Sequence, residues 1–179
     1  MTRKPSHTEL KKQLRNKTQN ELVEEITHLY KKFNNVKEFY QASFFNDDSA
    51  MLEKYKKIVR DEYIPSGRKQ FPSMRASVAR KAISDYKKIS CSNAGLADIM
   101  LTFVESDVWC TKEYGDIDES FYRSMESMYE NAINFITKES LLQEFNDRLL
   151  AIVEDTSGIG WWFHDTLSDT YDSYAGDVD

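Results

Sequence analysis

The second half of this chain contains no proline, and that absence constrains its fold more than any other feature. The three prolines are Pro5, Pro65 and Pro72, so none occurs in residues 73–179. Because proline removes a hydrogen bond from a helix interior and clashes with the preceding turn, its absence permits long helices. Apolar residues recur there at helical spacing, as in the stripe Leu96, Met100, Phe103, Asp107, Cys110 and Tyr114. The pattern predicts an all-α protein.

Helix-start signals and apolar stripes give the expected elements. Two capping boxes predict helix starts, at Ser6–Glu9 and at Thr18–Glu21. In a capping box, a hydroxyl residue and a glutamate three residues later each accept a hydrogen bond from the other's backbone N–H. Asn34 and Asn35 are expected to break the second helix. Further helices are expected near 50–63 after the turn and N-cap cluster Asn46–Ser49, near 73–89, near 93–114 with Ser92 as cap, near 119–137, after Ser140 as cap, and from near Ser157. The overall expectation is about seven helices, in an antiparallel helical-hairpin array or an irregular bundle.

Length and composition predict one domain over residues 1–179. Apolar residues make up 40% of the chain and charged residues 30%, which is typical of a globular protein. No run approaches the ~18 apolar residues of a membrane span, and the N-terminus lacks the apolar run of a signal peptide. Cys91 and Cys110 are predicted not to form a disulfide, which indicates a reducing, cytoplasmic location.

The charges are distributed unevenly along the chain. The basic half, residues 1–90, holds 20 Lys and Arg against 11 Asp and Glu, and the acidic half, residues 91–179, holds 4 against 19. One interpretation is that the two halves screen each other, within one domain or across a homo-oligomer. The other is that the basic half binds nucleic acid or another polyanion while the acidic half faces a different partner.

Residues 54–88 are the candidate polyanion surface because they hold eleven basic residues around the predicted basic loop 65–72. The candidate binding side chains are Lys56, Lys57, Arg68, Lys69, Arg80 and Lys81. No known nucleic-acid motif accompanies them. The acidic half would repel phosphates over about 10 Å at 0.1 M salt, which argues against a nucleic-acid footprint over the whole protein.

Asp107 is a candidate functional acid because its spacing puts it on an apolar helix face. Two interpretations stay open. The carboxylate lies at the edge of that face or pairs with a Lys or Arg of a neighbouring helix, or it is a buried acid with a raised pKa, useful in catalysis or as a ligand.

The stretch Glu154–Leu167 combines two of the six glycines, two of the three tryptophans and one of the three histidines with three acids. A helix from near Ser157 would place Trp161, His164 and Ser168 on one face. His164 with Asp165, Asp155 and Asp107 would then form an acid–base or metal-dependent enzyme centre.

Two other interpretations of the same stretch remain. Trp161, Trp162 and His164, with the backbone freedom of Gly158 and Gly160, would form an aromatic patch that binds a partner. Alternatively, the glycines permit a tight turn between helices, the two tryptophans pack against the junction, and His164 bonds a neighbouring backbone group. The stretch matches no phosphate-binding loop, because it has no Gly-Lys-Ser/Thr and no preceding strand.

Several segments resemble a known family. They are Glu9–Tyr40, Ile83–Ile89, Tyr114–Tyr122 and Glu154–Leu167, and the last two are the most specific. They are similar to domain-of-unknown-function family 6155, a family of uncharacterised bacterial proteins. The resemblance implies a single-domain bacterial cytoplasmic protein and brings no activity, cofactor or catalytic residue.

The leading functional hypothesis is a non-enzymatic protein-interaction or regulatory module that presents a groove between helical hairpins. Its partner is expected to be a protein, and neither a cofactor nor a metal is expected. The acidic segment Gly115–Glu119 lacks the ligand spacing of a calcium loop. The alternatives are polyanion binding through residues 54–88 and an enzyme centred on His164.

Overall fold

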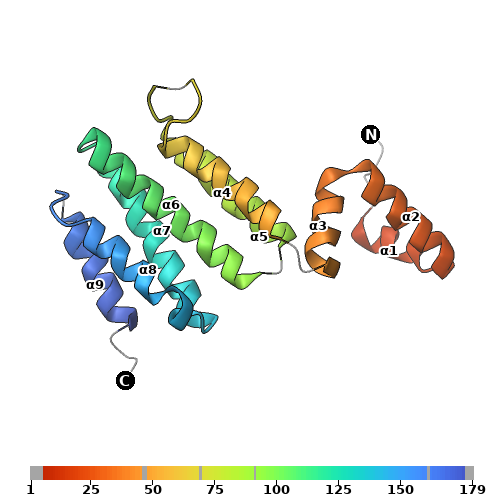
Figure 1. Ribbon diagram of the computed structural model, residues 1–179. Coiled ribbons are helices and arrows are strands. Elements are labelled where there is room, and N and C mark those ends of the chain that lie inside the picture. Colours follow the sequence, from red (N-terminus) through yellow and green to blue (C-terminus); the bar gives the residue numbers. More distant parts are fainter. Residues whose placement is uncertain (1–5, 46–47, 69, 91, 161, 176–179) are drawn as a thin grey trace. The chain divides into compact units, whose positions relative to one another are not determined.

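The computed structural model describes residues 6–45, 48–68, 70–90, 92–160 and 162–175, and within these ranges every regular element is an α-helix (Figure 1). The all-α prediction is confirmed, but the expected number of about seven helices was too low. The described residues form nine: α1 His7–Leu14, α2 Gln19–Lys32, α3 Asn34–Phe45, α4 Ser49–Tyr63, α5 Ala76–Ile89, α6 Asn93–Tyr114, α7 Glu119–Lys138, α8 Leu142–Asp155 and α9 Phe163–Ala175. Among the described residues, no helix has the length and apolar character needed to cross a membrane.

The chain divides into two compact units, Met1–Asn46 and Asp47–Asp179, which are described separately. The single domain expected over residues 1–179 stays a prediction. The N-terminal unit holds α1 to α3, and the C-terminal unit holds α4 to α9.

The N-terminal unit begins its helices as the sequence predicts. Ser6 and Thr18 are N-caps with complete capping boxes, in which Glu9 and Glu21 return the hydrogen bond. α2 ends at Lys32 because Phe33 adopts an extended conformation, and α3 starts at the next residue. A break was thus predicted in the right region, but it falls at Phe33, and Asn34 and Asn35 are the first residues of α3. Neither α1 nor α2 contains a buried residue, so this unit has little core of its own.

The C-terminal unit is built around α6. α4 packs on α5 and α6, α6 packs on α7, and α9 packs on α7 and α8. Most of α6 is buried around its whole circumference, which is typical of a helix surrounded by others. The largest fully buried side chains are aromatic: Tyr63, Tyr86, Tyr122, Tyr129, Phe103 and Phe163. Burying each such ring stabilises the fold by roughly 1.5–3 kcal/mol.

Arg148 joins α8 to α6 through the most extensive polar network of the described residues. It donates hydrogen bonds to both carboxylate oxygens of Glu105, to the Asp98 carboxylate and to Thr102 Oγ1, the last at 3.2 Å. Lys56 of α4 reaches the same Asp98 carboxylate, with Nζ 2.8 Å from Oδ2. Burial alone would raise the pKa of Asp98, but the hydrogen bonds from Lys56 and Arg148 bring it below its ordinary value. These ion pairs therefore connect α4, α6 and α8.

α5 begins three residues later than predicted. Arg75, its N-cap, points back to Glu62, with Nε 2.8 Å from Oε2 and Nη2 2.7 Å from Oε1. The Glu62 carbonyl also accepts from Met74 N at 2.7 Å. Because Glu62 is buried, these bonds satisfy a charge that would otherwise be costly to bury. They hold the residues before Ala76 in a loop.

Asp48 occupies the N-cap position that the sequence indicates, but its side chain does not cap α4. Its Oδ2 accepts hydrogen bonds from Tyr86 Oη at 2.7 Å and Ser90 Oγ at 2.8 Å. The carboxylate therefore fixes the end of α5 instead of the start of α4.

The prediction that Ser140 caps α8 is wrong. Ser140 has φ 59° and belongs to the end of α7. Its N–H bonds the Thr137 carbonyl at 3.1 Å, and the Leu141 N–H bonds the Ile136 carbonyl at 2.9 Å. This is the Schellman pattern, in which the left-handed position is usually glycine.

Replacing Ser140 with glycine is therefore expected to stabilise the protein by about 1 kcal/mol, because glycine adopts positive φ without strain. Chemical denaturation measures this change in the free energy of unfolding. Ser127→Gly, in the exposed interior of α7, is the matched control and is expected to destabilise by about 1 kcal/mol. If both substitutions destabilise equally, Ser140 is not strained.

Candidate functional site

The stretch Glu154–Leu167 covers the end of α8, the connection that follows it and the start of α9. Thr156, which is buried, donates from Oγ1 to the Val153 carbonyl at 2.6 Å. His164 Nδ1 lies 2.9 Å from Thr156 Oγ1 and 3.1 Å from the Val153 carbonyl. Because the Thr156 hydroxyl donates its proton to the Val153 carbonyl, His164 Nδ1 is the donor in its contacts with these two oxygens. His164 thus closes the turn onto the end of α8.

The helix expected from near Ser157 starts instead at Phe163, which corrects the predicted shared face of Trp161, His164 and Ser168. Trp161 lies outside the described residues. Gly158 has φ 83°, a value that favours glycine and supports the turn interpretation.

The turn interpretation expected Trp162 to pack against the junction between the helices. It does not, since 82% of its surface is exposed. Phe163 and Leu167, both fully buried, fill that place. Gly160 lies beside Asp116: an added Cβ would meet Asp116 Oδ2 at 3.5 Å.

The proposed catalytic residues have separate partners. Asp155 pairs with Lys112, and Asp165 is exposed. His164 contacts Thr156 and Val153, as described above, and Asp107 lies buried in α6. Over residues 6–45, 48–68, 70–90, 92–160 and 162–175, no group of three His, Cys, Asp or Glu side chains is placed to hold a metal. The enzyme hypothesis gains no support from this arrangement.

Asp107 is the buried acid that one of the two interpretations expected, with 1% of its surface exposed. Its Oδ1 and the Tyr63 hydroxyl lack a hydrogen bond of normal geometry within the described residues. Burial raises the pKa of Asp107 well above its ordinary value, and nearby Tyr63 and Arg80 offset that effect only in part. Burial, with a smaller contribution from Asp107, also raises the pKa of the Cys110 thiol to about 11.

The polyanion candidates are largely engaged within the protein. Lys56 pairs with Asp98, Lys57 with Asp61, and Lys81 with Asp85. Such pairs leave less positive charge to meet a phosphate backbone.

Arg80 turns inward. Its guanidinium lies 5.4 Å from the centre of the Phe103 ring and donates to the Ser124 carbonyl at 2.7 Å. Arg68 is exposed in the loop, and Lys69 lies outside the described residues. The nucleic-acid hypothesis stays a prediction.

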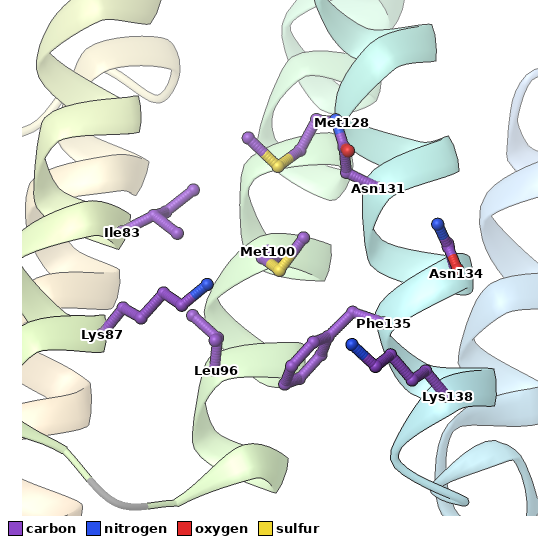
Figure 2. Close-up of a pocket in the computed structure, with 9 residues that line it drawn as sticks. All are labelled: Ile83, Lys87, Leu96, Met100, Met128, Asn131, Asn134, Phe135 and Lys138. Carbon is purple, nitrogen blue, oxygen red and sulfur yellow. The ribbon is translucent and has the colours of Figure 1, made fainter.

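A groove lies between α5 and α7, with α6 as its floor (Figure 2). Its volume is about 370 Å³. The apolar side chains that line it come from all three helices: Ile83, Leu96, Met100, Met128 and Phe135. The first four keep 5–9% of their surface, so the floor is narrow and lies at the base of the groove. Methionine adapts to irregular apolar partners because its side chain is unbranched and polarisable.

Two lysines flank this floor from opposite walls. Figure 2 shows Lys87 of α5 and Lys138 of α7 extending from the two sides toward the space above Leu96 and Phe135. Both side chains are exposed, and neither makes an ion pair within the part of the chain that the structure describes. Two like charges facing a shared opening favour an anionic occupant.

A second hollow of about 340 Å³ continues the groove toward the start of α6 and shares Lys87, Leu96, Phe135 and Lys138 with it. Along α7 the lining runs from Met128 to Glu139, a length of about 16 Å at 1.5 Å per residue. This length matches about three turns of a bound helix.

The sequence led us to expect a groove between helical hairpins but did not identify the residues that line this one. Its methionines and Phe135 lie on faces predicted to be buried, and Lys87 and Lys138 look like ordinary surface lysines. The only available signal was that neither lysine has an Asp or Glu three or four residues away, the spacing at which helix side chains form ion pairs.

The fold and the groove together define an all-α protein with a lysine-flanked apolar groove. The profile of a family of unknown function, DUF6155, matches residues 5–175, and the chain belongs to this family. The family match confirms the resemblance that the sequence segments indicated. No curated protein and no solved structure matches the chain.

Proposed function

We propose that this protein is a non-enzymatic interaction module whose groove between α5 and α7 binds an acidic amphipathic helix of a partner protein. The observation that carries the proposal is that Lys87 and Lys138 flank an apolar floor and make no ion pair with any residue that the structure describes. The antiparallel hairpin arrangement expected from the sequence would give such a groove between neighbouring hairpins.

The chemistry of the groove supports a helical occupant. Apolar side chains at i, i+3 or i+4, and i+7 of a bound helix would enter the slot above Leu96, Met100 and Met128, as in other helix-in-groove complexes. Acidic side chains on the flanks of that helix would meet Lys87 and Lys138. The apolar contacts would supply most of the affinity. The two lysine charges would favour a negatively charged partner and would determine its orientation in the groove.

A direct test uses synthetic helical peptides of about three turns. One carries leucines on one face and glutamates on the flanks, and a second carries lysines in place of the glutamates. Fluorescence anisotropy of labelled peptides is expected to show binding of the acidic peptide. The double variant Lys87→Glu, Lys138→Glu is expected to bind it at least about tenfold more weakly, because two attractions become repulsions.

The control is Lys57→Glu with Lys81→Glu, which makes the same change in net charge on lysines outside the groove. It is expected to leave the affinity within about twofold. If both double variants lose affinity equally, the attraction is a general charge effect. If neither peptide binds the wild-type protein, the proposed function is wrong.

A further inference from the structure

α2 presents an apolar face that is largely exposed. Val23 is 56% exposed, Ile26 40%, Leu29 37% and Phe33 44%. An amphipathic helix normally buries such a stripe against another element. The N-terminal unit therefore carries a surface that suits a further helix.

The stripe has the spacing of a coiled-coil seam. Leu22, Ile26, Leu29 and Phe33 are separated by four, three and four residues, which gives the 3.5-residue period of paired helices. Ile26 and Phe33 then occupy the a positions of a heptad, and Leu22 and Leu29 occupy the d positions.

The charges that flank the seam are complementary to a second copy of α2 running in the opposite direction. Glu25 and Lys32 both precede an a position, so they lie on the same flank, at g positions. In an antiparallel pair each g residue faces the other helix's g residue. Glu25 then meets Lys32 of the second copy, and the two-fold axis repeats this contact.

The opposite flank is also self-complementary. Val23 and Tyr30 follow the d positions, and in the antiparallel pair they face each other across the seam. A parallel pair would place Glu25 opposite Tyr30 and would form no ion pair. The pattern therefore selects the antiparallel arrangement.

From this complementarity we propose that the chain self-associates as a two-fold dimer through antiparallel pairing of α2. The exposed Phe39 and Phe44 of α3, at 40% and 73%, provide further apolar surface in the same unit. This inference concerns a surface distinct from the groove and does not depend on the proposed function.

Sedimentation velocity of the full chain, from micromolar to near-millimolar concentration, tests the proposal. The wild-type protein is expected to form a dimer, and Ile26→Asp is expected to remain monomeric because it buries a charge in the seam. The control is Ile159→Asp, a half-buried aliphatic residue of the C-terminal unit, which is expected to leave the dimer intact. A wild-type protein that stays monomeric throughout would overturn the proposal.

A charge exchange tests the antiparallel orientation. Glu25→Lys alone and Lys32→Glu alone are each expected to raise the dissociation constant about tenfold, because two attractive pairs become repulsive. The double variant Glu25→Lys, Lys32→Glu restores opposite charges across the axis and is expected to recover wild-type dimerisation.

A control is needed because Glu25 also pairs with Lys17 of its own chain. Lys17→Gln removes that pair and is expected to leave the dimer unchanged. A dimer that the single charge variants do not weaken, or that the double variant does not recover, would contradict antiparallel pairing.

Discussion

Replacing Arg148 with leucine is expected to destabilise the C-terminal unit by about 2–3 kcal/mol. The substitution removes the donor shared by Asp98 and Glu105 and leaves Asp98 with Lys56 alone. The expected loss is at the lower end for a broken ion pair, because the Arg148 side chain keeps 28% of its surface and solvent can reach the carboxylates left behind. Urea denaturation measures this loss.

The matched control is Arg123→Leu. Arg123 pairs with Glu119 one turn away on α7, and both side chains are largely exposed, at 73% and 62%. Its loss is expected to cost less than about 0.5 kcal/mol. If the two substitutions cost the same, the network between α6 and α8 does not hold the helices together.

Asp107→Asn is expected to stabilise the protein at neutral and alkaline pH by about 1–2 kcal/mol. The wild-type carboxyl is buried without a hydrogen bond to its Oδ1, so its charged form is disfavoured in the folded state. Asparagine keeps the shape of the side chain and carries no charge. Denaturation of the two proteins over a series of pH values measures the difference.

The sign of the pH dependence follows from the raised pKa of Asp107. Below the ordinary aspartate pKa of about 3.9 both states are protonated, and the two proteins should be nearly equally stable. As the pH rises from there to the folded-state pKa, the unfolded chain loses its proton first, so the wild-type protein loses stability and the advantage of the variant grows.

Asp147→Asn, at an exposed position of α8, is the control and is expected to change the free energy of unfolding by less than about 0.5 kcal/mol. If Asp107→Asn destabilises the protein at about pH 8, then Asp107 is ionised and the nearby Arg80 compensates its charge.

Local sequence signals predicted much of the fold. Ser6, Thr18 and Ser92 cap helices where hydroxyl residues precede apolar periodicity, and Gly115 ends α6 as expected. These features depend on neighbours in the chain, so a single sequence contains them. Ser140 misled the same reasoning, because a serine before a helix resembles an N-cap and the Schellman bonds that use it belong to the preceding helix.

Tertiary contacts decided what the sequence could not. Asp48 bonds Tyr86, 38 positions away, and does not cap α4. Glu62 bonds Arg75, 13 positions away, and α5 begins three residues later than expected. The periodicity placed Asp107 on the buried face, but whether Arg80 would pair with it depended on the packing of α5 against α6.

The position and the lining of the groove escaped prediction for the same reason. It requires α5, α6 and α7 to leave a gap above Met100 and Met128 that no local pattern encodes. Conversely, the unusual composition of Glu154–Leu167 is explained by a turn, with His164 held by Thr156 and Val153.

Methionine-methyl NMR provides the most direct test of the groove as a binding site. Protein labelled with ¹³C at the methionine methyl groups would be titrated with the acidic amphipathic peptide described above. Met100 and Met128 line the groove, whereas Met51 and Met125 are buried elsewhere in the same unit and serve as internal references. The account predicts saturable shifts at Met100 and Met128, unchanged signals at Met51 and Met125, and loss of the shifts in the Lys87→Glu, Lys138→Glu variant. Binding that leaves Met100 and Met128 unshifted would contradict it.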